Sequence, residues 1–337
     1  MIIIDGSEGE GGGQIVRNAC ALSLVTAEPF RITNIRGGRE KPGLMRQHVT
    51  AIEAACAIGG GTCEGVSVGS GEMSFTPGTV QGGDYHFAVG TAGSTGLVLQ
   101  TILMPLVLAG TPSRLVLEGG THNMLAPPFE FIERCFLPVI NRMGPTVTAK
   151  LVRHGFYPSG GGRIEVEITP APLVPVDCTE RGTLIDTSAI AFFAGLPFDV
   201  ADREIQTAKK LLDWPERSFA VRELPEERGP GNILLLEARH EHATEIVSGF
   251  GKARRARRTC GQAGGGADEG LSRLGCLCRA VSGRSVAVAV RAGGRRVLHH
   301  GQAERAQPDG RDDHRTLPGP ALRILAVAGR DAPDGAA

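Results

Sequence analysis

The residues best suited to chemistry near the N-terminus lie in a glycine-rich turn with two glutamates. The turn holds Glu8, Glu10 and the run 11–13, and Arg17 comes four residues later. Glycines let the backbone approach a ligand closely, and free N–H groups at a helix start bind anions. Because Glu10 would repel phosphate directly, the pattern predicts a corner that binds a divalent cation together with phosphate. A tight turn with solvated glutamates explains a lone glycine cluster equally well.

The elements that position this turn follow from the hydrophobic pattern. Residues 2–4 are three isoleucines, typical of a buried strand, and residues 14–24 have apolar side chains at helical spacing. A second glycine and hydroxyl turn at 90–96 runs into an apolar helix, and a third follows at 119–123. A unit of strand, glycine turn, helix and hairpin thus recurs at about 80 to 90 residues, which predicts an α+β core built from repeated units.

Further elements are expected along the chain. We predict strands at 30–36, 85–89, 114–118, 147–152, 164–168, near Leu184 and at 233–236; helices at 45–58, 97–108, 128–143 and 201–212; and a hairpin across 64–77 in which Val66 and Val68 alternate. A proline-rich stretch at 170–175 reads as a linker, so residues 1–180 form the core and 181–251 a small α/β domain.

The bulk composition is that of a globular protein. A chain of 337 residues predicts roughly two domains. The sequence contains no run of 18 apolar residues, so no membrane span is expected. The N-terminus lacks the basic region of a signal peptide. The eight cysteines are scattered, which favours reduced thiols and a cytoplasmic protein.

Residues 252–337 differ sharply from the rest of the chain. They contain 15 Arg but one Lys, one Ile and no aromatic residue, and they carry a net charge of +8 against −8 for residues 1–251. A basic tail that binds nucleic acid is one explanation. The other explanation is translation of a GC-rich gene in the wrong frame. If the codons of residues 305–307 are read one base later, they can encode Ala-His-Asn. We therefore expect a frameshift from about residue 252, which resequencing the gene would test.

A series of motifs in the first 250 residues resembles the RNA 3′-terminal phosphate cyclases, in particular their catalytic branch. The motifs cover about three quarters of the chain, and they are residues 5–17, 36–48, 77–85, 92–100, 126–128, 153–162 and 229–232.

This resemblance implies a core of three strand and helix units, the third disrupted here, with a smaller α/β domain inserted before it. It also implies an ATP-dependent conversion of an RNA 3′-terminal phosphate to a 2′,3′-cyclic phosphodiester, with Mg²⁺ or Mn²⁺. In that chemistry a histidine attacks the α-phosphorus of ATP, AMP passes to the RNA phosphate, and the ribose 2′-oxygen closes the ring.

The resemblance also implies roles for individual residues. Glu10 matches the metal-side glutamate of the family. Gln100 and Pro127 match residues that contact ATP. The phosphate-binding arginines of the family correspond to Arg17, Arg36 and Arg39. A lone arginine would otherwise be read as a surface ion pair, but a guanidinium fork suits a terminal phosphate.

The chain departs from the family at the nucleophilic histidine. The family keeps that residue near its C-terminus, whereas His299, His300 and His314 have no matching neighbours. We therefore assign no catalytic histidine and expect this chain to be inactive. His122 and His154 are internal alternatives that we do not assign. His48 is expected either to support the residues that contact the ligand or to lie on the RNA side.

Two other functions remain open at this point. The first is a non-catalytic cyclase-like protein that binds RNA or assists ribosome assembly, since that branch also lacks the histidine. The second is an enolpyruvyl transferase, which shares the repeated architecture, although the Gly-Glu-Gly-Gly-Gly-Gln motif argues against it.

Overall fold

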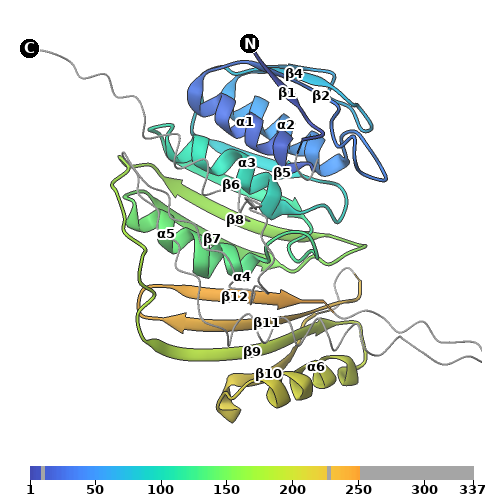
Figure 1. Ribbon diagram of the computed structural model, residues 1–337, viewed down its shortest axis with the longest axis vertical. Helices are drawn as coiled ribbons and strands as arrows, with labels where there is room; N and C mark the ends of the chain where they lie inside the picture. The colour runs from blue at the N-terminus through green and yellow to red at the C-terminus, as the bar shows by residue number, and fades with distance from the viewer. Residues whose placement is uncertain (9–11, 226–228, 251–337) are drawn as a thin grey trace, which may run out of the picture.

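Two units with one topology form the upper part of the molecule in the computed structural model, which describes residues 1–8, 12–225 and 229–250 (Figure 1). In the first unit the strand order is β1-β2-β4-β3, and β1 pairs with β2 in parallel. Its elements are β1 (Ile2–Asp5), α1 (Gln14–Thr26), β2 (Phe30–Thr33), α2 (Arg46–Gly59), β3 (Thr62–Glu64) and β4 (Met73–Thr76).

The second unit repeats this plan with the strand order β5-β6-β8-β7. The repeat begins at residue 84, 82 residues after the start of β1, so the expected spacing and the α+β class are confirmed. The elements are β5 (Asp84–Ala88), α3 (Thr95–Val107), β6 (Ser113–Gly119), α4 (Phe129–Phe131), the π-helix η1 (Ile132–Phe136), α5 (Leu137–Arg142), β7 (Thr146–Arg153) and β8 (Gly162–Thr169).

A third four-stranded sheet, ordered β10-β9-β11-β12, lies beside the second unit at the bottom of Figure 1. Its elements are β9 (Leu184–Ala194), α6 (Phe198–Leu211), the 3₁₀ helix η2 (Glu216–Ser218), β10 (Phe219–Glu223), β11 (Gly231–His240) and β12 (Thr244–Gly249). Strand β12 contacts α4 and η1 of the second unit, and Arg134 forms an ion pair with Glu237 at 2.8 Å across this junction.

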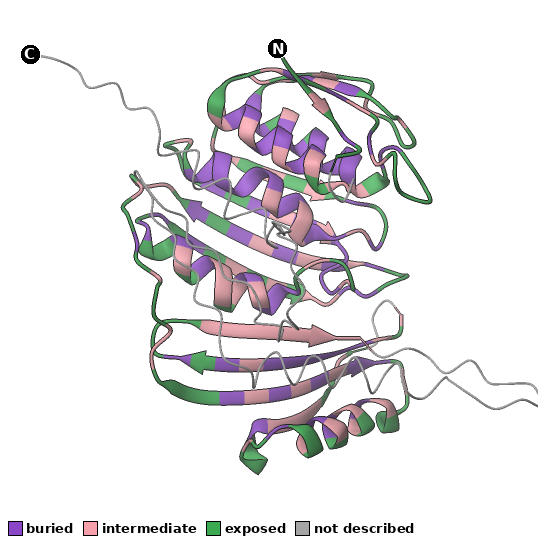
Figure 2. Ribbon diagram, in the orientation of Figure 1, coloured by how far each residue is buried: buried purple, intermediate pink, exposed green. Residues whose placement is uncertain are grey.

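One hydrophobic core runs through the first two units. Helices α1, α2 and α3 pack on one another, and their facing side chains are buried (Figure 2). Ile52 of α2 and Ile102 of α3 are both fully buried, and Phe30 stacks on Phe75 with ring centroids 5.7 Å apart. The third sheet has its own cluster around Ile205 and its neighbours. The units that carry the motifs are therefore one packed body, which fixes their turns relative to one another.

Most predicted elements are present, with bounds that differ by a few residues. The hairpin across 64–77 is wrong in detail, because Val66 and Val68 lie between β3 and β4 and belong to neither strand. Strands β10 and β12 were not predicted. Within the described residues, no helix is both long and apolar enough to cross a bilayer. Glu10 and the tail at 252–337 lie outside the described residues.

Candidate functional site

Arg17 is the centre of a cationic corner at the start of α1. Its side chain is buried, and its Nε forms no hydrogen bond with any described residue. Burial lowers the pKa of Arg17 to about 10. A buried charge is destabilising unless a counter-charge lies beside it, and no carboxylate among the described residues is paired with Arg17.

His48 lies directly against the glycine turn that precedes Arg17. The Nδ1 of His48 accepts a hydrogen bond from the Met45 backbone N–H at 2.9 Å, and the imidazole occupies the space that a Cβ on Gly13 would need. Burial, with the charges of Arg17 and Arg36, lowers the pKa of His48 to about 3. The ring is therefore neutral at physiological pH, with its proton on Nε2, the nitrogen that faces the turn.

Arg36 and Arg39 approach the same turn from the loop between β2 and α2. Arg36 has a left-handed backbone (φ 56°), and its Nη1 donates to the carbonyl oxygens of Lys41 at 2.6 Å and Gly43 at 2.9 Å. Burial and the charge of Arg39 lower the pKa of Arg36. The Nη2 of Arg39 lies 3.3 Å from the position of a Cβ on Gly12. Three guanidinium groups thus gather around a glycine turn at a helix start, an arrangement suited to phosphate.

A hydrogen bond connects this corner to the second glycine turn. Gln47, the neighbour of His48, accepts from the backbone N–H of Ser94 at 3.1 Å through its Oε1. Ser94 caps α3, since its Oγ accepts from the Leu97 N–H at 3.3 Å. The two turns at the starts of α1 and α3 are thereby held together.

The predicted ATP residues lie around the second turn. Gln100 is half-buried one helical turn after Gly96, and residues four apart share one face of a helix. The carbonyl oxygen of Pro127 is 3.8 Å from the position of a Cβ on Gly96, and Pro127 itself is exposed. The structure brings Gln100 and Pro127 to the same helix start, and it gives no direct contact between them and the three arginines.

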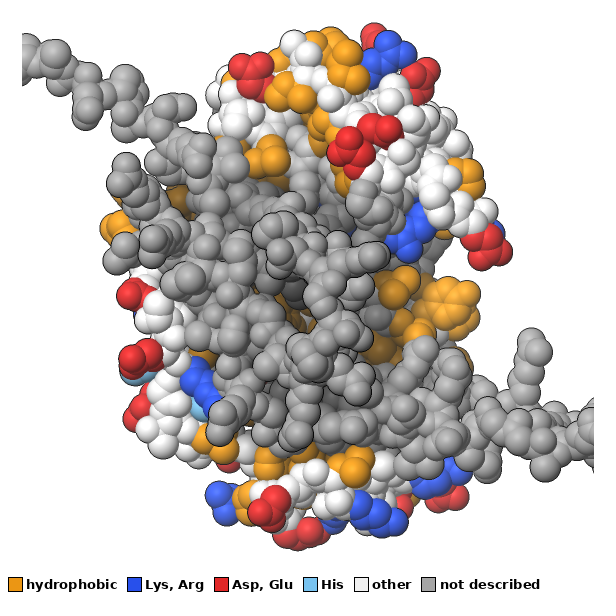
Figure 3. Space-filling model, viewed as in Figure 1, with side chains coloured by type: hydrophobic (Ala, Val, Ile, Leu, Met, Phe, Trp, Pro, Cys, Tyr) orange, Lys and Arg blue, Asp and Glu red, His pale blue; other side chains and the backbone are white. Residues whose placement is uncertain are grey.

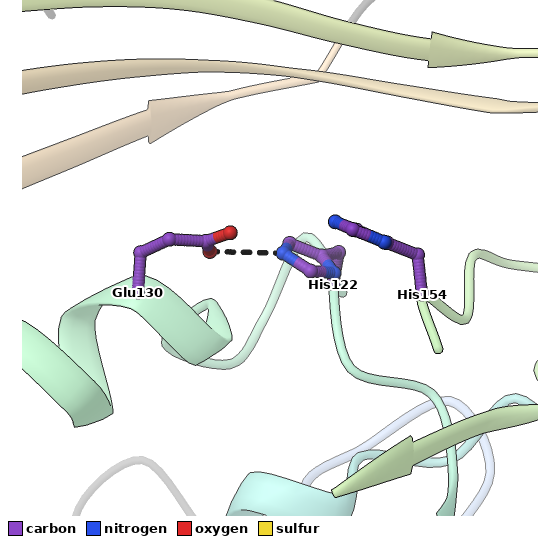
Figure 4. A group of neighbouring side chains, drawn as sticks. All are labelled: His122, Glu130 and His154. Atoms are coloured by element: carbon purple, nitrogen blue, oxygen red, sulfur yellow. Dashed lines mark hydrogen bonds and ion pairs between the residues drawn. The ribbon is translucent and has the colours of Figure 1, made fainter. Parts of the chain in front are cut away.

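A second polar cluster lies between the second unit and the third sheet (Figure 4). It consists of His122, Glu130 and His154, which offer ligand atoms within 4.8 Å of one another. The Nε2 of His122 is 2.9 Å from Oε2 of Glu130, and the ring of His122 stacks on that of His154 with centroids 5.0 Å apart. His122 and Glu130 are buried, and His154 is partly buried. Sequence reasoning considered both histidines but missed Glu130.

Elsewhere the described surface carries both signs of charge. In the space-filling view, acidic and basic side chains alternate around the rim, with hydrophobic side chains between them (Figure 3).

Repeated units of one topology, with one buried and two more exposed arginines beside a glycine turn, define an α+β protein suited to an anionic ligand. Comparison with known proteins agrees with that class. The profile of the RNA 3′-terminal phosphate cyclase family matches residues 8–303. The chain belongs to this family.

Several relatives carry that family name. The protein of Koribacter versatilis (strain Ellin345) is 50% identical over 253 residues, covering 75% of this chain and 71% of the relative. That of Ectopseudomonas mendocina (strain ymp) is 48% identical over 254 residues, covering 75% and 74%. That of Ralstonia nicotianae (strain ATCC BAA-1114 / GMI1000) is 49% identical over 253 residues, covering 74% and 72%.

Proposed function

We propose that the described residues form the ATP- and phosphate-binding part of an enzyme that cyclises RNA 3′-terminal phosphates. The observation that carries the proposal is Arg17, a buried guanidinium whose Nε has no partner among the described residues. An anion at the glycine turn would provide that partner. The phosphates of a nucleoside triphosphate or of an RNA end are such anions. Membership of the cyclase family supports this choice over other anions.

The reaction consists of three transfers at phosphorus. A histidine nitrogen bonds to the α-phosphorus of ATP, and pyrophosphate leaves with the electrons of the broken P–O bond. The RNA 3′-phosphate takes the AMP from that histidine. The ribose 2′-oxygen then attacks the activated phosphate and releases AMP, which leaves a 2′,3′-cyclic phosphodiester. Each transfer gathers negative charge on phosphoryl oxygens, which fixed guanidinium groups stabilise.

The residues divide into three roles. Arg17, Arg36 and Arg39 bind phosphate, with the Nε2–H of His48 as a neutral donor beside them. Gln100 and Pro127 contact the nucleotide at the start of α3. Glu10 would hold Mg²⁺ or Mn²⁺, which neutralises phosphate charge when bound. Glu10 lies outside the described residues, so we derive no step through a metal.

The nucleophilic histidine belongs to a part of the enzyme that this reading frame does not encode. The relatives align over about 253 residues and extend beyond the matched part, which supports a frame change near residue 252. The family profile itself continues to residue 303. We infer that the chain as written forms no covalent AMP adduct. The free thiols of the described cysteines and the use of ATP fit a cytoplasmic enzyme.

Labelled ATP tests this proposal. The chain as written and a frame-corrected chain are incubated with ATP labelled at the α-phosphorus and Mg²⁺ or Mn²⁺. The label that stays on the denatured protein at alkaline pH is counted, because a P–N bond to histidine is stable in alkali and labile in acid. We expect label only on the corrected chain, and loss of that label in its Arg17→Met form. Label on the chain as written would contradict the frame change. A corrected chain that binds RNA without taking up label would instead indicate a non-catalytic RNA-binding protein.

A further inference from the structure

The cluster of His122, Glu130 and His154 brings together three metal-ligating side chains from separate parts of the second unit. His122 lies in the glycine turn after β6, Glu130 in α4, and His154 directly after β7. Figure 4 shows the carboxylate of Glu130 directed at His122, with the ring of His154 reaching over it. His122 and Glu130 are buried and His154 is partly buried, so this is not a group of solvated surface charges.

The ligand types and spacing fit a borderline transition metal. Two imidazoles and one carboxylate are a common protein set for four-coordinate Zn²⁺, which leaves one position open. Bonds of about 2.1 Å in a tetrahedron place ligand atoms about 3.4 Å apart. Here Nε2 of His122 and Oε2 of Glu130 are 2.9 Å apart, and all three ligand atoms lie within 4.8 Å of one another. The tetrahedral spacing falls between these two distances.

The neighbours of His122 hold its ring in place for metal binding. Thr121 Oγ1 lies 2.8 Å from Nδ1 of His122 and accepts from the Gly155 backbone N–H at 2.9 Å. When Nδ1–H donates to Thr121, the Nε2 lone pair is directed at Glu130. A hydrogen bond to the far nitrogen is how metal-binding histidines are usually oriented. A cation can therefore replace the proton that otherwise joins His122 to Glu130.

His154 has an available nitrogen and access to space. It forms no hydrogen bond with any described residue, and its contacts are the rings of His122, Phe156 and Phe192. It also lines a cavity of about 90 Å³ at the junction with the third sheet, together with Leu224 and other residues. A cavity of this size holds a water molecule, which would occupy the open coordination position.

We propose that His122, Glu130 and His154 bind one Zn²⁺ ion or a similar transition-metal ion. This site is separate from the Mg²⁺ or Mn²⁺ proposed for the ATP site at the start of α1. Mg²⁺ prefers oxygen ligands, so a site with two imidazoles selects a different metal. The ion would join three elements of the second unit beside β9, since His154 contacts Phe192 of that strand. Its expected effect is to stabilise the junction between the second unit and the third sheet.

Metal binding to the whole chain, after removal of metals by a chelator, tests the proposal. Zn²⁺ is titrated by calorimetry, and Co²⁺ is used as a spectroscopic probe of tetrahedral coordination. We expect one ion per chain, a Co²⁺ absorption band of tetrahedral type, and a higher melting temperature with Zn²⁺. Glu130→Gln and His154→Asn should each weaken binding by about tenfold or more.

The control is a second histidine and glutamate pair that lacks a third ligand. His86 Nε2 lies 3.6 Å from Glu118 Oε2 on the exposed side of the second sheet. His86→Asn should leave Zn²⁺ affinity unchanged. If Glu130→Gln does not fold, His154→Asn decides alone, because His154 is only partly buried. Absence of stoichiometric binding, or equal affinity in His154→Asn and the parent chain, would overturn the site and leave a structural His122–Glu130 hydrogen bond.

Discussion

The backbone N–H of Ser94 donates a hydrogen bond to Oε1 of Gln47 across 47 residues of sequence. Because His48 packs on the first glycine turn, this bond makes α2 a bridge between the starts of α1 and α3. The two parts of the proposed ATP site are therefore positioned by one short stretch of α2.

Replacement of Gln47 by Ala should loosen the second turn. Loss of one hydrogen bond costs about 1 kcal/mol of unfolding free energy. Amide exchange at Ser94 should accelerate, as measured by NMR or mass spectrometry. Gln206→Ala, which removes a hydrogen bond to Asp202 on the surface of α6, is the matched control. Unchanged protection at Ser94 would show that the bridge does not order the turn.

A side chain at residue 13 should be poorly tolerated. Gly13 has an ordinary helical backbone (φ −66°, ψ −8°), so Ala fits there except for the imidazole of His48. Forced overpacking costs about 1–3 kcal/mol, which urea unfolding of Gly13→Ala would measure.

Two comparisons make that test specific. A Cβ on Gly38 would meet no atom within 4 Å, so Gly38→Ala should be nearly neutral. In the double variant Gly13→Ala with His48→Ala, the penalty of the first change should largely disappear. Equal costs in the presence and absence of His48 would contradict the steric explanation.

The buried charge of Arg17 should lower the free energy of unfolding of the protein and at the same time support the binding of ATP. Arg17→Met removes a buried charge without a described partner, and we expect the unfolding free energy to rise by about 1 kcal/mol or more. Binding of ATP or pyrophosphate, measured by calorimetry, should fall below detection. Arg31→Met, which breaks an exposed ion pair with Glu72, should change neither quantity appreciably. A less stable Arg17→Met protein with intact binding would assign Arg17 a purely structural role.

Glu204 should make stability decrease between mildly acidic and neutral pH. Its Oε1 accepts from Asn232 at 2.8 Å, its Oε2 has no described partner, and burial raises its pKa to about 7. Between the ordinary value of 4.5 and about 7, the folded state holds more protons than the unfolded state, so unfolding free energy falls as pH rises. At about 1.4 kcal/mol per unit, the loss approaches 3 kcal/mol.

Urea unfolding as a function of pH measures this effect. Glu204→Gln should flatten the profile through that window, whereas Asp213→Asn, at an exposed position after α6, should leave it unchanged. A profile of the parent chain that rises with pH through the same window would contradict the raised pKa.

The repeated core could be predicted because its signals are local. The predicted helix at 45–58 differs from α2 by one residue at each end, since apolar spacing and Gly60 mark it clearly. The sequence could not place β12, whose six residues are all partly buried and so lack the alternation that marks a strand. Val66 and Val68 do alternate, but they lie in a turn-rich loop, which shows that two residues are too few to specify a strand.

The cationic corner around Arg17 could be predicted from the sequence, whereas the cluster of His122, Glu130 and His154 could not. Arg17, Arg36 and Arg39 could be singled out because they occur in family motifs. The structure adds that the charges of Arg17 and Arg36 lower the pKa of His48 and that Arg39 lies beside Gly12. Nothing local connects Glu130 with His154, which are 24 residues apart and meet only through packing. The one available signal was a histidine in a glycine turn at His122, and a single histidine does not identify a metal site.

The shared topology of the two units also separates their chemical roles. Helix α3 begins 81 residues after α1, so the position that holds Arg17 in the first unit holds Val98 in the second. Arg17 is a buried cation, whereas Val98 is a buried aliphatic residue. The two equivalent helix starts therefore differ in charge, so only the first offers a guanidinium group to a phosphate.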